Sequence, residues 1–290
     1  MIYHYHPITE NNLIISIDNI VLDVWVSNPD MRDMIEAKIS YLPRNKVELV
    51  AWEGCRPGTF RQQYLFKLEN GTSFWLGHGL IGIGIAVERY RLEFNPNKVA
   101  INPIFKTIHE LLVRHARKPL SRIARFDLAI DIPVDRAKCF LVKDRRLYIE
   151  RRHGVEYTQY LGAKSSTVGR VKLYNKTVEA KLNYPLTRLE LTLDPAVAYE
   201  DINFPTVYCL KSVSMADERV RVTETERFIL NALLQGFGTL NDLGRKTRAK
   251  MDTIMKQYVE TIHISSEAYA SVLERLAGYL IGNEETTNPK

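Results

Sequence analysis

The segment 170–179 brings cations, a phenol and a carboxylate together in a pattern suited to attack on a phosphate ester. Read as a strand, it places Arg170, Lys172 and Tyr174 on one face and apolar residues on the other, with Lys176 and Glu179 just beyond. A tyrosine hydroxyl among cations is what an enzyme needs to attack an anionic phosphodiester. The same alternation also fits an exposed antiparallel strand whose tyrosine is only an amphipathic surface residue.

Three more strand-like segments, 91–95, 123–131 and 188–193, alternate polar and apolar residues and carry Glu93, Asp127 and Glu190. Carboxylates are depleted in strands, and crowded carboxylates raise one another's pKa. If these strands are neighbours, the acids gather with Tyr174 on one open face. Oxygen ligands alone favour a hard divalent cation, Mg²⁺ or Mn²⁺. The alternative is that each acid pairs with a neighbouring arginine on a solvated face.

Other chemical signatures are weak or absent from the sequence. His4 and His6 have the His-hydrophobic-His spacing of a metal-binding pair, but they lie at the extreme N-terminus, where a frayed end is a poor platform for a metal. No phosphate-binding loop, dinucleotide fingerprint or Ser-His-Asp pattern occurs. Cys55, Cys139 and Cys209 lack zinc or redox spacing, which favours a reduced, cytoplasmic compartment.

Composition indicates a folded protein with a modest excess of basic residues. The chain has 290 residues, 45% of them hydrophobic, and a net charge of +6; its pI is about 9.1. Cations cluster at 114–118, 143–146, 151–152 and 245–250, and such patches suit nucleic acid, although each also fits a solvated surface. We expect neither a signal peptide nor a membrane-spanning segment, because the longest apolar run, 80–87, is far too short to span a bilayer.

The order of elements predicts an α+β fold with a large antiparallel sheet. Strand-like runs cover 13–27, 63–69, 72–76, 88–95, 122–132, 145–150, 156–163, 168–175 and 187–193, and Asn70-Gly71 indicates a hairpin with positive φ at both turn residues. Helical patterns cover 30–39, 103–118, 223–235, 240–262 and 265–281. The alternation places helices on one face of the sheet and the catalytic residues on the open face. We expect a sheet domain over 1–200, a helical part over 201–282 and a disordered tail over 283–290.

Four motifs, in order, resemble the rolling-circle replication initiators of small Gram-positive plasmids, the group called Rep_trans or replication initiation factor. They are 91–99 (Arg-Leu-Glu-Phe-Asn-Pro-Asn-Lys-Val), 125–131 (Arg-Phe-Asp-Leu-Ala-Ile-Asp), 160–162 with 170–179, and 188–193. A weaker similarity lies near 244–256, and the first 60 residues match poorly. The run 162–166 departs from the family's usual Gly-Ser or Gly-Val-Arg sequence before the tyrosine strand.

The resemblance implies a role for each of these positions. Tyr174 falls on the family's nucleophilic tyrosine, and Lys172 and Lys176 would activate it or neutralise the phosphate. The metal ligands for Mg²⁺ or Mn²⁺ would be Glu93, Asp127, Glu179 and Glu190. DNA would be bound by Arg170 and Arg188 and, in the C-terminal origin-binding and dimer region, by Arg245, Lys246, Arg248 and Lys250.

The implied activity is that of a site-specific nicking-closing endonuclease and strand transferase that initiates plasmid rolling-circle replication. It would bind origin DNA as duplex and as extruded single strand, form a 5′-phosphotyrosine and leave a 3′-OH primer. Family members act as homodimers and bring a host superfamily-one helicase to the origin. Three alternatives remain: the same chemistry in a phage replication factor or conjugative relaxase, a non-catalytic DNA-binding regulator on the same scaffold, and a metal-dependent nuclease without a covalent adduct.

Overall fold

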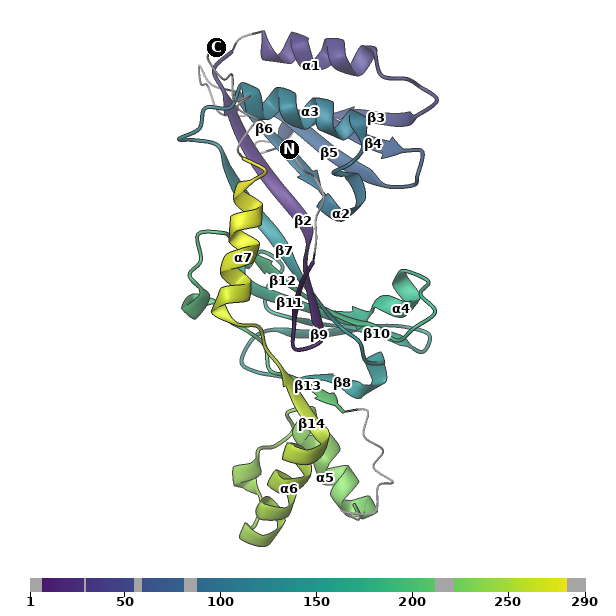
Figure 1. Cartoon of the computed structure of the whole chain (residues 1–290), viewed down its shortest axis with the longest axis vertical. Helices are drawn as coiled ribbons and strands as arrows, with labels where there is room; N and C mark the ends of the chain where they lie inside the picture. Colours follow the sequence, from purple (N-terminus) through teal and green to yellow (C-terminus); the bar gives the residue numbers. More distant parts are fainter. Residues whose placement is uncertain (1–6, 29, 55–58, 81–87, 212–221, 281–290) are drawn as a thin grey trace, which may run out of the picture.

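The computed structural model describes residues 7–28, 30–54, 59–80, 88–211 and 222–280, which form an elongated α+β molecule built on one large sheet (Figure 1). Several sequence features fall outside these residues. They are the pair His4 and His6, Cys55, most of the apolar run 80–87 and the tail 283–290.

The large sheet has eleven strands, and every neighbouring pair is antiparallel. Ten strands follow the order β3-β4-β5-β6-β2-β7-β12-β11-β10-β9, while β1 pairs with β2 beside this path. Their bounds are β1 Ile8–Glu10, β2 Leu13–Val26, β3 Val47–Glu53, β4 Phe60–Leu68, β5 Ser73–Leu80, β6 Glu88–Phe94, β7 Arg122–Ile132, β9 Tyr148–His153, β10 Glu156–Leu161, β11 Val168–Asn175 and β12 Thr187–Leu193. The predicted fold class is confirmed.

The central strand β2 changes phase half-way along its length. Its residues in the main hydrophobic core fall on odd positions up to Ile17 and on even positions from Ile20 onward. The pairing of β2 with β7 shifts between Ile17 and Asn19, which marks a β-bulge. Asp18 and Asn19 lie at this bulge, so two consecutive polar residues leave the apolar core. Because β2 lies between β6 and β7, the strands of Glu93 and Asp127 are not direct neighbours.

The predicted hairpin is formed by β4 and β5, but its turn differs from the expectation in one residue. Gly71 has a φ of 76°, whereas Asn70 does not have a positive φ. The Asn70 side chain instead accepts a hydrogen bond from the N–H of Thr72 at 3.1 Å. The N–H of Gly71 donates to the carbonyl of Leu68 at 2.9 Å. A loop of this length needs one left-handed glycine, not two left-handed residues.

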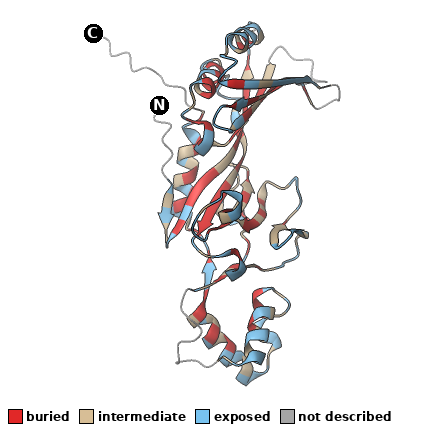
Figure 2. Ribbon diagram, turned by 90° about the vertical axis from the view of Figure 1, so that its right-hand side faces the viewer, coloured by how far each residue is buried: buried red, intermediate tan, exposed pale blue. Residues whose placement is uncertain are grey.

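Helices cover one face of the sheet and bury its apolar side chains (Figures 1 and 2). They are α1 Met31–Ser40, α2 Pro96–Val99, α3 Pro103–Arg114 and α7 Ser266–Ala277. The helix α3 begins where predicted, because the side chain of Asn102 accepts hydrogen bonds from the N–H groups of Ile104 and Phe105 and Pro103 fits the first turn. Phe105 then packs against Phe74 and Phe94 of the sheet.

His109 of α3 lies wholly inside this core, with no exposed surface. Its ring stacks on Phe105 with centroids 5.5 Å apart, and its Nε2 lies 3.0 Å from the carbonyl oxygen of Tyr279. Burial lowers the pKa of His109 to about 4, because a charged imidazole would lose its hydration here.

The stability of the protein is expected to fall in acid partly through His109. An unfolded histidine has a pKa of about 6.5, so its contribution to stability is complete above that pH and is lost as pH falls towards 4. The loss amounts to roughly 2–3 kcal/mol by about pH 4.5. Urea unfolding of wild type and His109→Gln near neutrality and near pH 4.5 measures it. Equal acid losses in the two proteins would contradict this assignment.

The predicted C-terminal helical part is divided between two places. The helices α5 (Glu224–Leu234) and α6 (Arg245–Tyr258) pack around a small core of their own, which includes Leu230, Leu234 and Ile254, and form a lobe at one end of the molecule (Figure 1). The predicted capping box at Thr223 and Glu226 starts α5. In contrast, α7 returns to the large sheet and joins its core.

A small second sheet, in the order β14-β13-β8, connects the lobe to the main body. Its strands are β8 Cys139–Leu141, β13 Val207–Leu210 and β14 Val259–Ile262. The helix expected over 240–262 is therefore shorter than predicted. A 3-10 helix, Leu240–Asp242, precedes α6, and the β-branched residues that follow pair with β13. None of the described helices is long and apolar enough to cross a membrane.

Candidate active site

Tyr174 lies near the end of β11, on the face of the sheet opposite the helices. Strand pairing sets Tyr174 opposite Arg188 of β12 and Lys172 opposite Glu190. Directly opposed residues of antiparallel strands share one face and lie about 4.5–5.5 Å apart at Cβ. The sequence pattern that predicted these faces is thus confirmed for β11 and β12.

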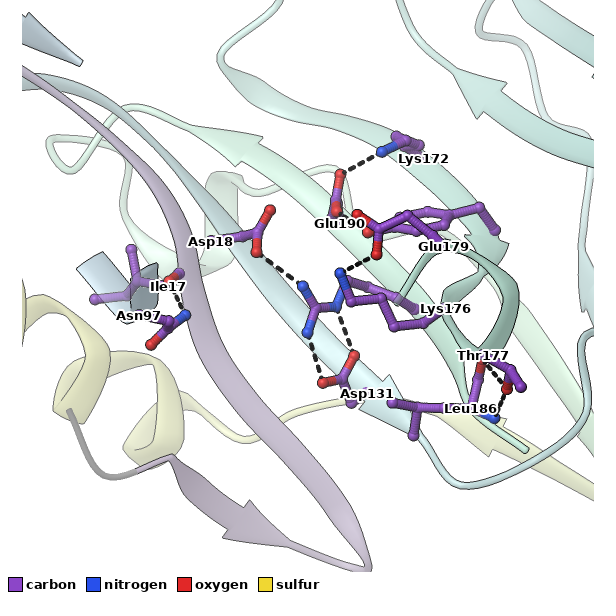
Figure 3. Close-up of polar contacts among 12 residues, drawn as sticks. Ile17, Asp18, Asn97, Asp131, Lys172, Lys176, Thr177, Glu179, Leu186 and Glu190 are labelled. Carbon is purple, nitrogen blue, oxygen red and sulfur yellow. Dashed lines mark hydrogen bonds and ion pairs between the residues drawn. The ribbon is translucent and has the colours of Figure 1, made fainter. Parts of the chain in front are cut away.

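The hydroxyl of Tyr174 donates a hydrogen bond to Oε1 of Glu190 at 2.6 Å. The other carboxylate oxygen of Glu190 accepts from Nζ of Lys172 at 3.1 Å, and the same ammonium lies 3.8 Å from the centre of the Tyr174 ring (Figure 3). Burial and the adjacent Glu190 carboxylate raise the pKa of the Tyr174 phenol far above its usual value. The phenol is therefore protonated at neutral pH, with a base already in hydrogen-bond contact.

The short helix α4, Lys176–Glu179, follows Tyr174 directly. The ammonium of Lys176 contacts the carboxylate of Glu179 one turn away and lies 5.9 Å from the Tyr174 ring. Lys176 is buried, whereas the side chain of Glu179 is half-exposed. Lys176 therefore adds positive charge beside the phenol, and Glu179 offsets part of that charge.

Arg188, the cross-strand neighbour of Tyr174, joins the buried Asp131 and the partly exposed Asp18 in an ionic network; Figure 3 labels both aspartates. Its guanidinium donates to both oxygens of Asp131, at 2.6 and 2.7 Å, and to Oδ1 of Asp18 at 2.8 Å. Asn95 also donates to Asp18, at 3.0 Å. The sequence did not single out Asp18 or Asp131 as site residues. For Asp18, the phase change of β2 was a signal, because bulges occur next to active sites.

Asp127 of β7 lies on the same face, opposite Thr192 of β12 and Asn19 of β2. Thr192 hydrogen-bonds its carboxylate, yet Oδ1 of Asp127 is buried and has no hydrogen-bond partner in the described part of the chain. Burial raises the pKa of Asp127 to about 6, and the charge of Glu190 adds to the effect. An orphaned, buried carboxylate oxygen is what a bound cation or phosphate-linked water would satisfy.

Asp127 is expected to make the metal-free protein less stable as pH rises. Its folded pKa lies above the ordinary value of 3.8, so its contribution to stability is complete below pH 3.8 and is lost as pH rises through 6. In the presence of EDTA, Asp127→Asn should therefore be more stable than wild type near pH 8, by about 1–3 kcal/mol. Urea unfolding near pH 4 and pH 8 tests this. An unchanged difference between the two proteins across that range would disprove the assignment.

Glu93 lies further away, because β2 separates its strand from β7. Its carboxylate accepts from Asn19 at 3.0 Å and from Arg125 at 3.4 Å, and both members of the ion pair are about two-fifths exposed. It borders an open groove of about 450 Å³ that also includes Trp75. This is the acid–arginine pairing that the sequence left open as an alternative.

The four predicted metal ligands thus enter different contacts. Within the described ranges, no three His, Cys, Asp or Glu side chains lie close enough to hold a metal ion together. Asp127 is the predicted ligand with a buried oxygen left over, while both oxygens of Glu190 are engaged. Since Mg²⁺ often binds through one or two carboxylates and completes its shell with water and phosphate, Asp127 fits such an ion.

The predicted DNA-binding cations also differ in what they contact. The guanidinium of Arg188 is occupied by carboxylates. In α6, Arg248 donates to the carbonyls of Leu240, Asn241 and Leu243, which end the preceding 3-10 helix, and Lys250 pairs with Glu226. For Arg170, Arg245 and Lys246, the described residues provide no acidic partner. As far as the described residues show, the charge of these three cations is not neutralised by a carboxylate and can meet a polyanion.

Comparison with known proteins finds similarity among solved structures. No family model matches the chain, and no curated protein sequence matches it. The chain is similar in structure to a rolling circle replication initiator protein from Geobacillus stearothermophilus, with a TM-score of 0.38 and 11% identity over 91% of this chain and 96% of that one. The functional conclusion therefore rests on the side chains of the site.

Proposed function

We propose that the chain is a DNA nicking and strand-transfer enzyme in which Tyr174 is the nucleophile. The observation that carries this proposal is the 2.6 Å hydrogen bond from the Tyr174 hydroxyl to Glu190, with Lys172 on the other oxygen of that carboxylate. Enzymes activate a hydroxyl nucleophile by placing it in contact with a base that a third group orients. Here Tyr174 would be the nucleophile, Glu190 the base and Lys172 the third group.

In the proposed step, the Tyr174 oxygen attacks phosphorus and its proton passes to Glu190. The bond from phosphorus to the 3′ oxygen breaks, and that oxygen takes a proton from water to become a free 3′-OH, while Glu190 releases the proton of the phenol back to water. The products are a 5′-phosphotyrosine and a primer end. The reverse attack by a 3′-OH rejoins the strand without ATP, because the covalent link preserves the phosphodiester energy.

A divalent cation, Mg²⁺ or Mn²⁺, would be held by Asp127, with Glu190 nearby, and would supply Lewis-acid stabilisation of the phosphate charge. Glu93 and Glu179 are less suited to this role, because each already pairs with a cation and is more exposed to water than Glu190. Lys172 and Lys176 would add positive charge around the phosphate. Their ammonium groups already lie at the ring of Tyr174.

Access to Tyr174 requires movement of its neighbours. The residue is only 6% exposed, so a phosphodiester reaches the hydroxyl after the side chains around it shift. Lys172 and Glu179 are the more exposed of these neighbours. Entry of an anionic phosphate would draw Lys172 away from Glu190, and that exchange would leave Glu190 a stronger base towards the phenol.

The biological setting that fits this chemistry is initiation of plasmid rolling-circle replication. We propose that the lobe of α5 and α6 binds the duplex origin through Arg245 and Lys246, and that a homodimer and a host superfamily-one helicase complete the assembly. The large sheet would receive an extruded single strand. The charge of +6 and the basic clusters support a nucleic-acid partner.

A denaturing gel tests the proposed function directly. The protein is incubated with a labelled single-stranded origin oligonucleotide and Mg²⁺ or Mn²⁺. A labelled band that migrates with the protein and disappears on proteolysis is the expected phosphotyrosine adduct. Free fragments without an adduct would identify a hydrolytic nuclease instead. No cleavage, with binding retained, would identify a DNA-binding regulator.

A further inference from the structure

An aromatic and cationic surface lies next to Tyr174 on the open face of the sheet. Strand pairing sets Tyr160 of β10 opposite Lys172 of β11, and Arg151 of β9 opposite Thr158, two residues before Tyr160. All of these therefore point to the same side of the sheet as Tyr174. Tyr174 is two residues beyond Lys172, which makes Tyr160 its diagonal neighbour, with backbones about 7–8 Å apart.

The ring of Tyr160 lies between two guanidinium groups. Those of Arg151 and Arg170 are each 5.6 Å from its centroid. In the described part of the chain neither arginine has a carboxylate partner, and the Tyr160 hydroxyl makes no hydrogen bond. The ring itself is half-buried. Two cations without a carboxylate partner among the described residues thus lie over a partly exposed aromatic ring at the edge of the candidate active site.

This surface has a firm support. On the opposite face of the same strands, Leu161, Val171 and Leu173 are fully buried in the main core. The backbone that carries Tyr160 and Arg170 is therefore fixed by packing, so ligand binding here requires ordering of side chains but not of the backbone.

Single-stranded DNA has the chemistry that fits such a surface. Its bases are free to stack on an aromatic ring, and its phosphates pair with guanidinium groups. Duplex DNA offers the phosphates alone, because its bases are already stacked on one another. An acidic peptide would pair with the arginines but would leave the ring without a stacking partner.

We propose that Arg151, Tyr160 and Arg170 form a binding site for single-stranded DNA, in which Tyr160 stacks on a base beside the phosphodiester that Tyr174 attacks. The position of this base relative to the nick rests on the proposed function. The binding site itself does not, since binding needs no cleavage.

The first test separates base stacking from phosphate contact. Affinity is measured by fluorescence anisotropy in the Tyr174→Phe background for an oligothymidylate and for an abasic oligomer of the same length. Tyr160→Leu should weaken oligothymidylate binding by roughly 5- to 100-fold and leave abasic binding nearly unchanged. Equal losses for the two oligomers, or no loss for either, would overturn the stacking role. A thermal unfolding curve confirms that the variant is folded.

The second test uses two adjacent arginines that face opposite sides of β9. Arg151 faces Tyr160, whereas Arg152 pairs with Glu150 at 2.7 Å. Arg151→Ala should weaken single-strand binding several-fold and reduce the slope of log affinity against log salt by about 0.7. Arg152→Ala removes the same charge and should change neither quantity. Similar effects of the two substitutions would show that DNA is attracted by net charge alone, and this result would contradict the proposal.

The third test measures affinity for duplex DNA. Tyr160→Leu should leave affinity for a blunt duplex unchanged, and a parallel loss would show that the surface does not distinguish unpaired strands. If no strand is cleaved but the binding results are as expected, the catalytic proposal alone is wrong. An adduct formed at the wild-type rate by a variant with both Tyr160→Leu and Arg151→Ala would remove the binding proposal alone.

Discussion

Replacing Tyr174 by phenylalanine is expected to abolish strand cleavage and the covalent adduct, with a loss of at least ~10⁴-fold in rate. The substitution removes the one atom that attacks phosphorus and keeps the ring that Lys172 and Lys176 contact. Among the described residues the Tyr174 hydroxyl hydrogen-bonds Glu190 alone, so the free energy of unfolding should fall by only about 1–3 kcal/mol. Single-turnover cleavage of a labelled origin strand measures the rate, and anisotropy measures the retained DNA affinity.

Two matched variants sharpen this result. Tyr184→Phe makes the same change at an exposed tyrosine before β12 and should cleave at the wild-type rate. Glu190→Gln keeps an oxygen that accepts the phenol hydrogen bond but cannot take the proton, so cleavage should fall by roughly 10²- to 10⁴-fold. Residual cleavage by Tyr174→Phe at a rate near wild type would exclude this tyrosine as the nucleophile.

The faces of the catalytic strands were predictable because alternation along a strand decides which side chains share a face. That rule alone placed Tyr174 with Lys172, and Glu190 with Arg188, before any pairing was known. Register was not predictable from alternation. It is strand pairing that sets Lys172, and not Tyr174, opposite Glu190 and so lets one carboxylate meet both groups.

The order of the strands in the sheet also could not be predicted from the local sequence. The acids at Glu93 and Asp127 look equivalent in sequence, yet β2 inserts between their strands and turns Glu93 towards Arg125. The bulge in β2 left a trace in the sequence, since two consecutive polar residues, Asp18 and Asn19, interrupt the alternation along the strand. Its consequence, a second carboxylate on Arg188 beside that of Asp131, depends on pairing between residues far apart in the chain.

The ionic network around Arg188 leads to the second large effect, on stability. Arg188→Leu is expected to lower the free energy of unfolding by about 3–5 kcal/mol, because it leaves the buried carboxylate of Asp131 without a partner. Arg188→Lys should recover only part of this loss, since an ammonium cannot bind both oxygens of Asp131 as the guanidinium does. Chemical unfolding at neutral pH gives each value.

The double variant Arg188→Leu with Asp131→Leu distinguishes burial from attraction as the source of this effect. Removing both charges should restore most of the stability, because the cost arises from an uncompensated buried charge, and Asp18 keeps Asn95 and partial exposure to water. Arg125→Ala, which breaks the half-exposed pair with Glu93, should cost less than about 1 kcal/mol. If the double variant were no more stable than Arg188→Leu, the guanidinium would have to act through packing, and the network would then position Tyr174 by shape instead of charge.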